Sequence, residues 1–212
     1  MNRALMSGIG LALSFSWSMA GASLITSAPA GGTTTVLTTV SGTWGSALSV
    51  VAGGFTVTAP SGSSVWYGDN KYEFVTNGAW EDFAWVGGYC YAGACTATID
   101  LDGLFSSVGG FMNYSPGNGI PAITAIAADG ITVLESYDLS MDAPISLVAG
   151  SYPGAFRGIS RATADIAYFR ISGSYLVAHD LTTAGASVPE PATLALLGLG
   201  LAGIGYSRRR TS

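Results

Sequence analysis

The side chains best suited to binding chemistry are concentrated between residues 66 and 91. Nine aromatic residues fall within these twenty-six positions, namely Trp66, Tyr67, Tyr72, Phe74, Trp80, Phe83, Trp85, Tyr89 and Tyr91. Aromatic rings stack on the apolar faces of sugar rings, while hydroxyl, amide and carboxylate groups bond the sugar hydroxyls. The pattern predicts a carbohydrate platform made of Trp66, Tyr67, Trp80, Tyr89 and Tyr91. Core packing is the competing explanation and the default, because strands also fill their interior with aromatic rings, here above all Phe74, Phe83 and Trp85.

Two cysteines follow most of this aromatic segment and could form a disulfide. Cys90 and Cys95 enclose four residues that include Gly93, which favours a tight turn. Two cysteines in an exported chain normally pair, and the ends of this chain indicate export. We therefore expect a disulfide that rigidifies the loop and adds about 2 kcal/mol to the free energy of unfolding. A redox-active thiol pair is the alternative, although thiol oxidoreductases use the spacing Cys-x-x-Cys.

Side chains that could catalyse a reaction are sparse. His179 is the only histidine, and no Gly-x-Ser-x-Gly motif marks a nucleophile that it could activate. One histidine and two cysteines also lack the ligand spacing of a zinc site. We expect no catalytic residue, and a secreted hydrolase is the most distant of the alternatives.

Calcium is the cofactor that the sequence leaves open. Oxygen-bearing side chains occur in pairs at Asp69-Asn70, Asp100-x-Asp102 and Asp138…Asp142, but none of these segments matches an EF-hand loop. Aspartate and asparagine also populate turns, where they bond the local backbone. We expect no cofactor and keep, as an alternative, a structural Ca²⁺ with ligands among Asp100, Asp102 and Asp180.

The elements that would position these side chains are predicted to be strands. No long segment combines a 3.6-residue apolar period with helix caps. Short β-branched or aromatic runs recur instead at Thr35–Val40, Phe55–Thr58, Lys71–Val75, Asp82–Val86, Thr96–Leu101, Ala122–Ala128, Ile131–Ser136, Ile145–Val148, Ala164–Ser172 and Ser174–His179. Asp129-Gly130 predicts a two-residue hairpin turn, and Gly173 marks another strand boundary. The chain is therefore expected to form an all-β domain, a two-sheet antiparallel β-sandwich, with Ser23–Gly32 as a loose lead-in and Thr182–Ser187 as a linker.

The N-terminus and the charge balance indicate an exported acidic domain. Arg3, the apolar run Ile9–Phe15 and the small residues Ala20-Gly21-Ala22 predict a signal peptide over residues 1–22. Without this segment and the C-terminal tail, residues 23–187 contain four basic and twelve acidic residues, a net charge of about −8. An acidic surface of this kind argues against binding to nucleic acid.

The C-terminus combines three features in a fixed order. Pro189, Glu190 and Pro191 form an extended segment, because proline fixes φ and disfavours helix at the residue before it. An uncharged stretch, Ala192–Tyr206, follows and would span about 22 Å as a helix, short of a full hydrocarbon core of roughly 30 Å. The chain then carries a basic cluster, which should remain cytoplasmic by the positive-inside rule, at Arg208, Arg209 and Arg210.

This tail resembles the PEP-CTERM sorting tail of bacterial envelope proteins. The resemblance implies that an exosortase-type enzyme processes the chain at the Pro-Glu-Pro segment, with the apolar helix in the inner membrane only until then. It also implies a destination at the cell surface or in the extracellular matrix. The expected organisation is a signal peptide (1–22), a β-sandwich domain (23–187) and a sorting tail (188–212). A plain single-pass anchor is the alternative explanation of the tail.

Segments in the second half of the domain carry a further resemblance. Residues 108–114, 123–139, 154–160 and 166–182 are together similar to the jelly-roll module, of the galactose-binding-like or lectin-like kind, that is common ahead of such tails. The two resemblances imply an exported, non-catalytic surface or matrix protein associated with exopolysaccharide. The alternative is a lectin-like module that binds carbohydrate through the Trp66–Tyr91 region.

Overall fold

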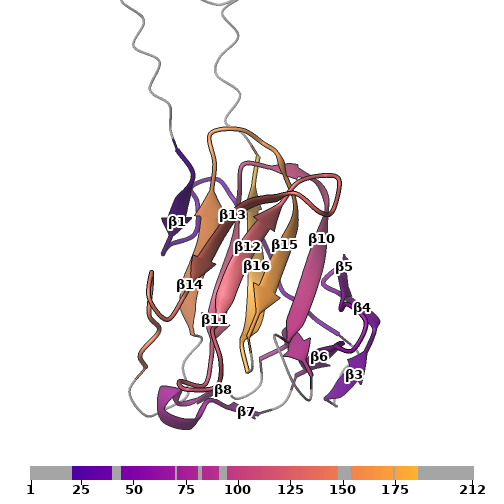
Figure 1. The fold of residues 1–212 in the computed structure, drawn as a ribbon, viewed down its shortest axis with the longest axis vertical. Coiled ribbons are helices and arrows are strands. Elements are labelled where there is room, and N and C mark those ends of the chain that lie inside the picture. Colours follow the sequence, from indigo (N-terminus) through magenta and orange to yellow (C-terminus); the bar gives the residue numbers. More distant parts are fainter. Residues whose placement is uncertain are drawn as a thin grey trace, which may run out of the picture.

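The described part of the protein is built from antiparallel β-strands in two large sheets (Figure 1). A computed structural model describes residues 21–39, 44–69, 71–80, 83–90, 95–147, 154–173 and 175–185. Residues 1–20 of the predicted signal peptide and the whole predicted sorting tail lie outside these ranges. No helix among the described residues is long and apolar enough to cross a membrane.

The larger sheet contains eight strands. They are β1 (Ser23–Ile25), β2 (Thr33–Thr35), β3 (Gly45–Ala47), β6 (Ser64–Gly68), β9 (Trp85–Tyr89), β11 (Ser107–Asn113), β14 (Ala155–Ser160) and β16 (Val177–Ala184). Their order is β1-β14-β11-β16-β9-β6-β3, and β2 pairs with the second half of β16.

The smaller sheet contains six strands, in the order β13-β12-β15-β10-β5-β4. They are β4 (Ser49–Ala52), β5 (Phe55–Thr58), β10 (Thr96–Phe105), β12 (Ala122–Ile126), β13 (Val133–Asp138) and β15 (Ile166–Ser172). A separate two-stranded hairpin is formed by β7 (Tyr72–Glu73) and β8 (Ala79–Trp80), which are joined by a 3₁₀ turn, η1 (Val75–Asn77). The hairpin lies at the lower end of the sandwich in Figure 1.

Alternation of side chains along the strands builds the core between the sheets. In β10, Ala97, Ile99 and Leu101 are buried in the main apolar cluster, while the residues between them are partly exposed. Val86 and Ala178 join the same cluster from the larger sheet. Successive side chains of a strand point to opposite faces, so each sheet has one inner and one outer face. The predicted all-β sandwich is therefore confirmed, and the jelly-roll subtype stays a prediction.

Several predicted strands match observed ones. Phe55–Thr58 coincides with β5, and four further predictions overlap β10, β12, β13 and β15. The hairpin predicted at Asp129-Gly130 is present as the antiparallel pair β12 and β13, but its loop is longer than two residues. Asp129 Oδ1 accepts the backbone N–H groups of Ile131 at 2.9 Å and Thr132 at 2.8 Å, which stabilises this longer loop.

Expectations about three segments are wrong. Ser23–Ile25, expected in a loose lead-in, forms β1 and pairs with β14. The expected linker at Thr182–Ser187 begins within β16, where Thr182 and Thr183 pair with β2. Residues 145–147 of the predicted strand Ile145–Val148 have no strand structure. Propensity does not identify strands that are completed by distant pairing partners.

Candidate functional site

The aromatic segment predicted from the sequence lies on the outer face of the larger sheet. Val65 and Val86 belong to the interior cluster, so their chain neighbours Trp66 and Trp85 point outward. Trp85 forms a second apolar cluster there with Val177 of β16 and with three residues from the β7–β8 hairpin segment, Tyr72, Phe74 and Trp80. The hairpin thus covers part of an outer face that is itself apolar.

Buried amide hydrogen bonds attach this hairpin to the sandwich. Asn77 in η1 is buried, and its Nδ2 donates to the carbonyl oxygens of Tyr114 at 3.0 Å and Ile145 at 2.9 Å. Asn113, at the end of β11, donates from Nδ2 to the Asn77 carbonyl at 2.9 Å. A buried amide with satisfied partners fixes local geometry, because breaking the bonds would leave polar atoms without water. These bonds position Trp80 against the sheet.

A cleft of about 260 Å³ opens beside the aromatic cluster. Its lining is mainly aromatic and comprises Trp44, Trp66, Tyr72, Trp85 and Tyr175, together with the charged residues Lys71 and Glu73. Trp44 is 61% exposed, and its ring meets Trp66 edge-to-face with 6.0 Å between the ring centroids. Trp66 also contacts the rings of Tyr72 and Trp85, at centroid distances of 5.6 and 5.8 Å. The cleft is therefore a rigid aromatic surface that solvent reaches. We call it the aromatic cleft.

Polar groups complete the aromatic cleft. Lys71 Nζ and Glu73 Oε1 form an exposed ion pair at 2.9 Å. The Tyr72 hydroxyl is buried and makes no hydrogen bond to the described residues. Burial raises the pKa of this hydroxyl, and the neighbouring Tyr175 raises it further. Tyr72 therefore stays protonated, and its hydroxyl remains a buried donor without an acceptor among the described residues.

The structure places the predicted platform residues in different environments. Trp66 lines the aromatic cleft, and the ring of Tyr89 contacts Trp66 at a tilt of 40°, with 4.9 Å between the ring centroids. Trp80 is fully buried, so its prediction as a platform residue is wrong. Tyr67 packs, partly buried, against the interior cluster on the face of β6 opposite to Trp66, and it does not line the aromatic cleft. Tyr91 lies outside the described residues.

Two cleft residues were not predicted. Trp44 lies far upstream of the aromatic segment and Tyr175 far downstream, and both are brought to Trp66 by the sheet. Trp44 directly precedes β3, which pairs with β6. Tyr175 lies in the connection that enters β16, with a left-handed backbone φ of 61°. A tryptophan isolated among small polar residues was the available signal for Trp44.

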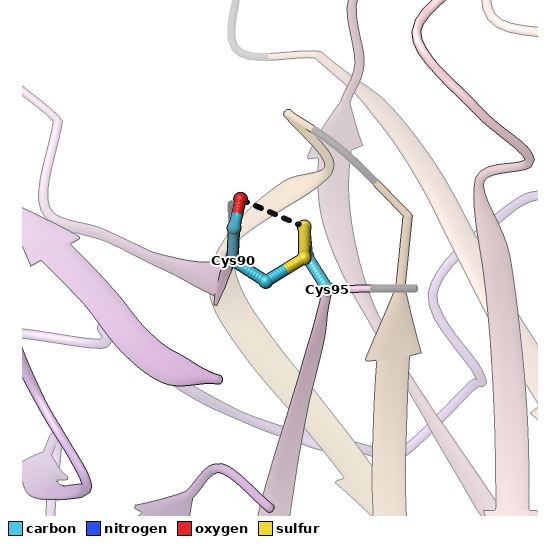
Figure 2. Close-up of a disulfide and its surroundings, with 2 residues drawn as sticks. All are labelled: Cys90 and Cys95. Carbon is cyan, nitrogen blue, oxygen red and sulfur yellow. Dashed lines mark hydrogen bonds between the residues drawn. A yellow bond between two sulfur atoms is a disulfide. The ribbon is translucent and has the colours of Figure 1, made fainter. Parts of the chain in front are cut away.

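The predicted disulfide between Cys90 and Cys95 is present (Figure 2). The two Cα atoms are 5.1 Å apart. Cys90 directly follows β9 of the larger sheet, and Cys95 directly precedes β10 of the smaller sheet. The bridge therefore closes the connection at which the chain passes from one sheet to the other.

The histidine is enclosed by aromatic rings. His179 is 2% exposed and stacks between Phe83 and Phe111, at centroid distances of 4.9 and 5.4 Å. The ring of Trp80 meets it edge-to-face at 4.9 Å. Its Nδ1 lies 3.2 Å from Oδ2 of Asp180. Both faces of the imidazole are therefore covered by aromatic rings.

The predicted calcium ligands are not brought together. Asp100 and Asp102 are in β10 of the smaller sheet, whereas Asp180 is in β16 of the larger one. Asp100 Oδ1 instead accepts the backbone N–H of Asp102 at 3.0 Å. Within the described ranges, no group of three or more His, Cys, Asp or Glu side chains could hold a metal ion.

Comparison with known proteins identifies the tail. Residues 187–210 match the PEP-CTERM protein-sorting motif, which confirms the prediction made from the Pro-Glu-Pro segment and the arginine cluster. This motif is the signal by which exosortase recognises its substrates, and it indicates an exported protein that is anchored in the membrane and then processed. No curated protein and no solved structure matches the chain significantly.

Proposed function

We propose that this chain, which carries a PEP-CTERM sorting motif and is therefore exported and processed, is a polysaccharide-binding protein of the cell surface or extracellular matrix. In this proposal the exosortase-type enzyme acts at the segment Pro189–Pro191, and the β-sandwich then binds exopolysaccharide through the aromatic cleft. The proposal contains no catalytic step. The enclosed position of His179 supports that part of it.

The observation that carries the proposal is the exposed indole of Trp44 beside Trp66. A large apolar ring that is 61% exposed gains little from folding, since most of its surface stays in water. The edge-to-face contact with Trp66 nevertheless gives this ring a defined orientation. A sugar ring that stacks on Trp44 would remove the exposed apolar surface from water.

The polar groups of the cleft suit a sugar better than a purely apolar ligand. The exposed side chains of Lys71 and Glu73 offer both a donor and acceptors at the edge of the cleft. Small-molecule sites combine this kind of apolar wall with a few convergent polar groups. The cleft volume of about 260 Å³ accommodates one or two sugar rings of a longer chain.

Affinity electrophoresis tests the proposal. The purified protein is run in native gels that contain dextran, galactomannan or xanthan, and we expect retardation in at least one of them. Trp44→Ala should weaken the apparent affinity about tenfold, since an aromatic stacking contact contributes roughly 1–1.5 kcal/mol.

Met141→Ala is the matched control, because Met141 is 77% exposed and lies outside the aromatic cleft. It should migrate like the unmodified protein in every gel. Absence of retardation in all three gels would contradict the proposal, as would equal retardation of Trp44→Ala and Met141→Ala.

A further inference from the structure

A second and larger cleft lies on the opposite side of the sandwich, on the outer face of the six-stranded sheet. Its volume is about 580 Å³. The side chains that matter for binding are polar and come from three adjacent strands: Thr56 and Thr58 of β5, Thr98 and Asp100 of β10, and Tyr168 and Arg170 of β15. We call it the polar groove.

Strand register places these side chains in two rows across the sheet. Thr98 lies opposite Thr58 on one side and opposite Arg170 on the other. Asp100 lies in the same way between Thr56 and Tyr168. Opposed residues of antiparallel strands share a face, so each row presents its side chains together to solvent.

The inner face of the same strands is fully apolar. Val57, Ile99 and Phe169 alternate with the groove residues and are 0% exposed. A register slip of one residue would exchange the two faces, which the buried core forbids. The position of every groove side chain is therefore fixed by the packing beneath it.

Arg170 differs from the other basic residues of the sandwich. Lys71 pairs with Glu73, and Arg161 pairs with Asp165 and Glu135. The buried Arg157 donates three hydrogen bonds to backbone carbonyls.

Arg170, by contrast, forms no ion pair with the described residues. Its one hydrogen bond within them runs from Nε to Thr98 Oγ1, at 3.2 Å. Four of its five N–H donors, those on the two terminal nitrogens, thus remain available in the groove.

A guanidinium with its fork free is suited to a carboxylate. The planar pair of N–H groups matches the two oxygens of a carboxylate in a bidentate arrangement, which is among the strongest hydrogen-bonded contacts in proteins. In a domain with a net charge of about −8, a cation without an acidic partner is an exception to the surrounding charge. The contact with Thr98 orients the guanidinium from the side of its Nε.

The other side chains of the groove are suited to a ligand that is larger than a small anion and carries hydroxyl groups. Asp100 repels a bare anion but accepts hydrogen bonds from sugar hydroxyls, and the threonine hydroxyls both donate and accept. The Tyr168 ring offers an apolar face in the same row as Asp100, its register partner. The row that contains Arg170 thus suits a carboxylate, and the adjacent row with Asp100 and Tyr168 suits a hydroxylated ring.

We propose that the polar groove binds a polysaccharide that contains uronic acid, with the sugar carboxylate on Arg170 and neighbouring hydroxyls on Asp100 and the threonines. The groove volume of about 580 Å³ accommodates several sugar units. This site does not depend on the aromatic cleft, which lies on the other sheet and shares no lining residue with it.

The test is a calorimetric titration of the purified protein with oligogalacturonate. We expect binding that falls about tenfold in Arg170→Gln, because a charged bidentate contact is lost. Arg170→Lys should bind with intermediate affinity, since it retains the charge and loses the fork. Methyl-esterified oligogalacturonate, which keeps the sugar rings and lacks the charge, should bind to the unmodified protein as weakly as the acid form binds to Arg170→Gln.

Two controls separate the outcomes. Met141→Glu changes the net charge by the same unit outside both clefts and should retain full binding. Trp44→Ala should leave the difference between the acid and the ester unchanged, so a failure of the aromatic cleft does not affect this test.

The proposal is overturned if Arg170→Gln, with an unaltered unfolding midpoint, binds oligogalacturonate like the unmodified protein. It is equally overturned if the acid and the ester bind alike. If poly-glutamate bound as tightly as oligogalacturonate, the proposal would also be overturned, because poly-glutamate carries carboxylates without sugar rings.

Discussion

The two outer faces of the sandwich have opposite characters although both are built from strands with the same alternation. On the eight-stranded sheet, Trp66 and Trp85 point outward and are joined by aromatic residues of the β7–β8 hairpin segment. On the six-stranded sheet, the outward residues of β5, β10 and β15 are mostly threonine and charged residues, and they form an open groove. One face is largely covered, and the other is left to solvent.

The difference shows what an aromatic outer face requires. Large apolar rings on a sheet surface need a second layer to remove them from water, and here a short hairpin and its 3₁₀ turn supply that layer. The cover ends before Trp44, which therefore remains exposed at the edge of the aromatic cleft. The threonine face needs no such layer, because its hydroxyls are hydrated.

The largest expected effect concerns the covered face. Trp80→Ala should lower the free energy of unfolding by about 3–5 kcal/mol, because it removes a fully buried indole and leaves a cavity between the hairpin and the sheet. Urea unfolding followed by circular dichroism measures this loss. Trp44→Ala is the control and should cost less than about 1 kcal/mol, since that ring is mostly exposed. Equal losses in the two variants would show that the hairpin is not a structural cover.

The next effect concerns the connection between the two sheets. Reduction of the Cys90–Cys95 bridge, or its replacement by serine at both positions, should lower the free energy of unfolding by about 2 kcal/mol. The estimate is small because the bridge closes a short loop. Unfolding of the oxidised and reduced protein in urea gives the difference directly, and the serine variant should not respond to reductant. Identical midpoints for the oxidised and reduced protein would refute a stabilising role.

The smallest effect concerns a charge cluster in the connection between the two sheets, where β14 of the larger sheet leads into β15 of the smaller. Hydrogen bonds from Arg161 hold the pKa of Asp165 below its ordinary value. A carboxyl group whose pKa is lowered by folding stabilises the folded state above its unfolded pKa, near 4, and this contribution is lost as the pH falls through the folded pKa.

Asp165→Asn should therefore lower stability at pH 7 by less than about 1 kcal/mol and reduce the loss of stability below about pH 4. Thermal unfolding between pH 2.5 and 7 measures both changes. Glu73→Gln, which removes an exposed ion pair on the hairpin, is the comparison variant. It should change the loss of stability below about pH 4 by less than Asp165→Asn does. An unchanged pH profile in Asp165→Asn would contradict this assignment.

Strand prediction succeeded where apolar and polar side chains alternate, and it missed β11 and β14, where two backbones approach closely at glycine. Phe55–Thr58 was predicted with its observed bounds because apolar side chains (Phe55 and Val57) alternate with threonines. Gly109 in β11 and Gly158 in β14 lie opposite each other, and a Cβ at Gly109 would come within 2.6 Å of the Gly158 Cα. Glycine there permits close approach of two backbones, a requirement set by tertiary packing that local sequence does not reveal.

The candidate site was predicted in part for a similar reason. Trp66 and Trp80 were predicted together from one aromatic segment, and membership of that segment did not distinguish Trp66 from Trp80, which the hairpin buries. Trp44 and Tyr175 join the aromatic cleft only through the pairing of β3 with β6 and the path into β16. The polar groove was missed because its residues come from three strands that are far apart in the sequence.

The proposed stacking of polysaccharide on the exposed indole of Trp44 can be followed at the ring itself. The most direct test is to follow the tryptophan indole N–H signals by NMR while adding oligosaccharides prepared from the polymer that retards the protein most. We expect the signals of Trp44 and Trp66 to shift in a saturable way, while the signal of the buried Trp80 does not move. Saturable binding that leaves the Trp44 signal unchanged would contradict the proposed stacking.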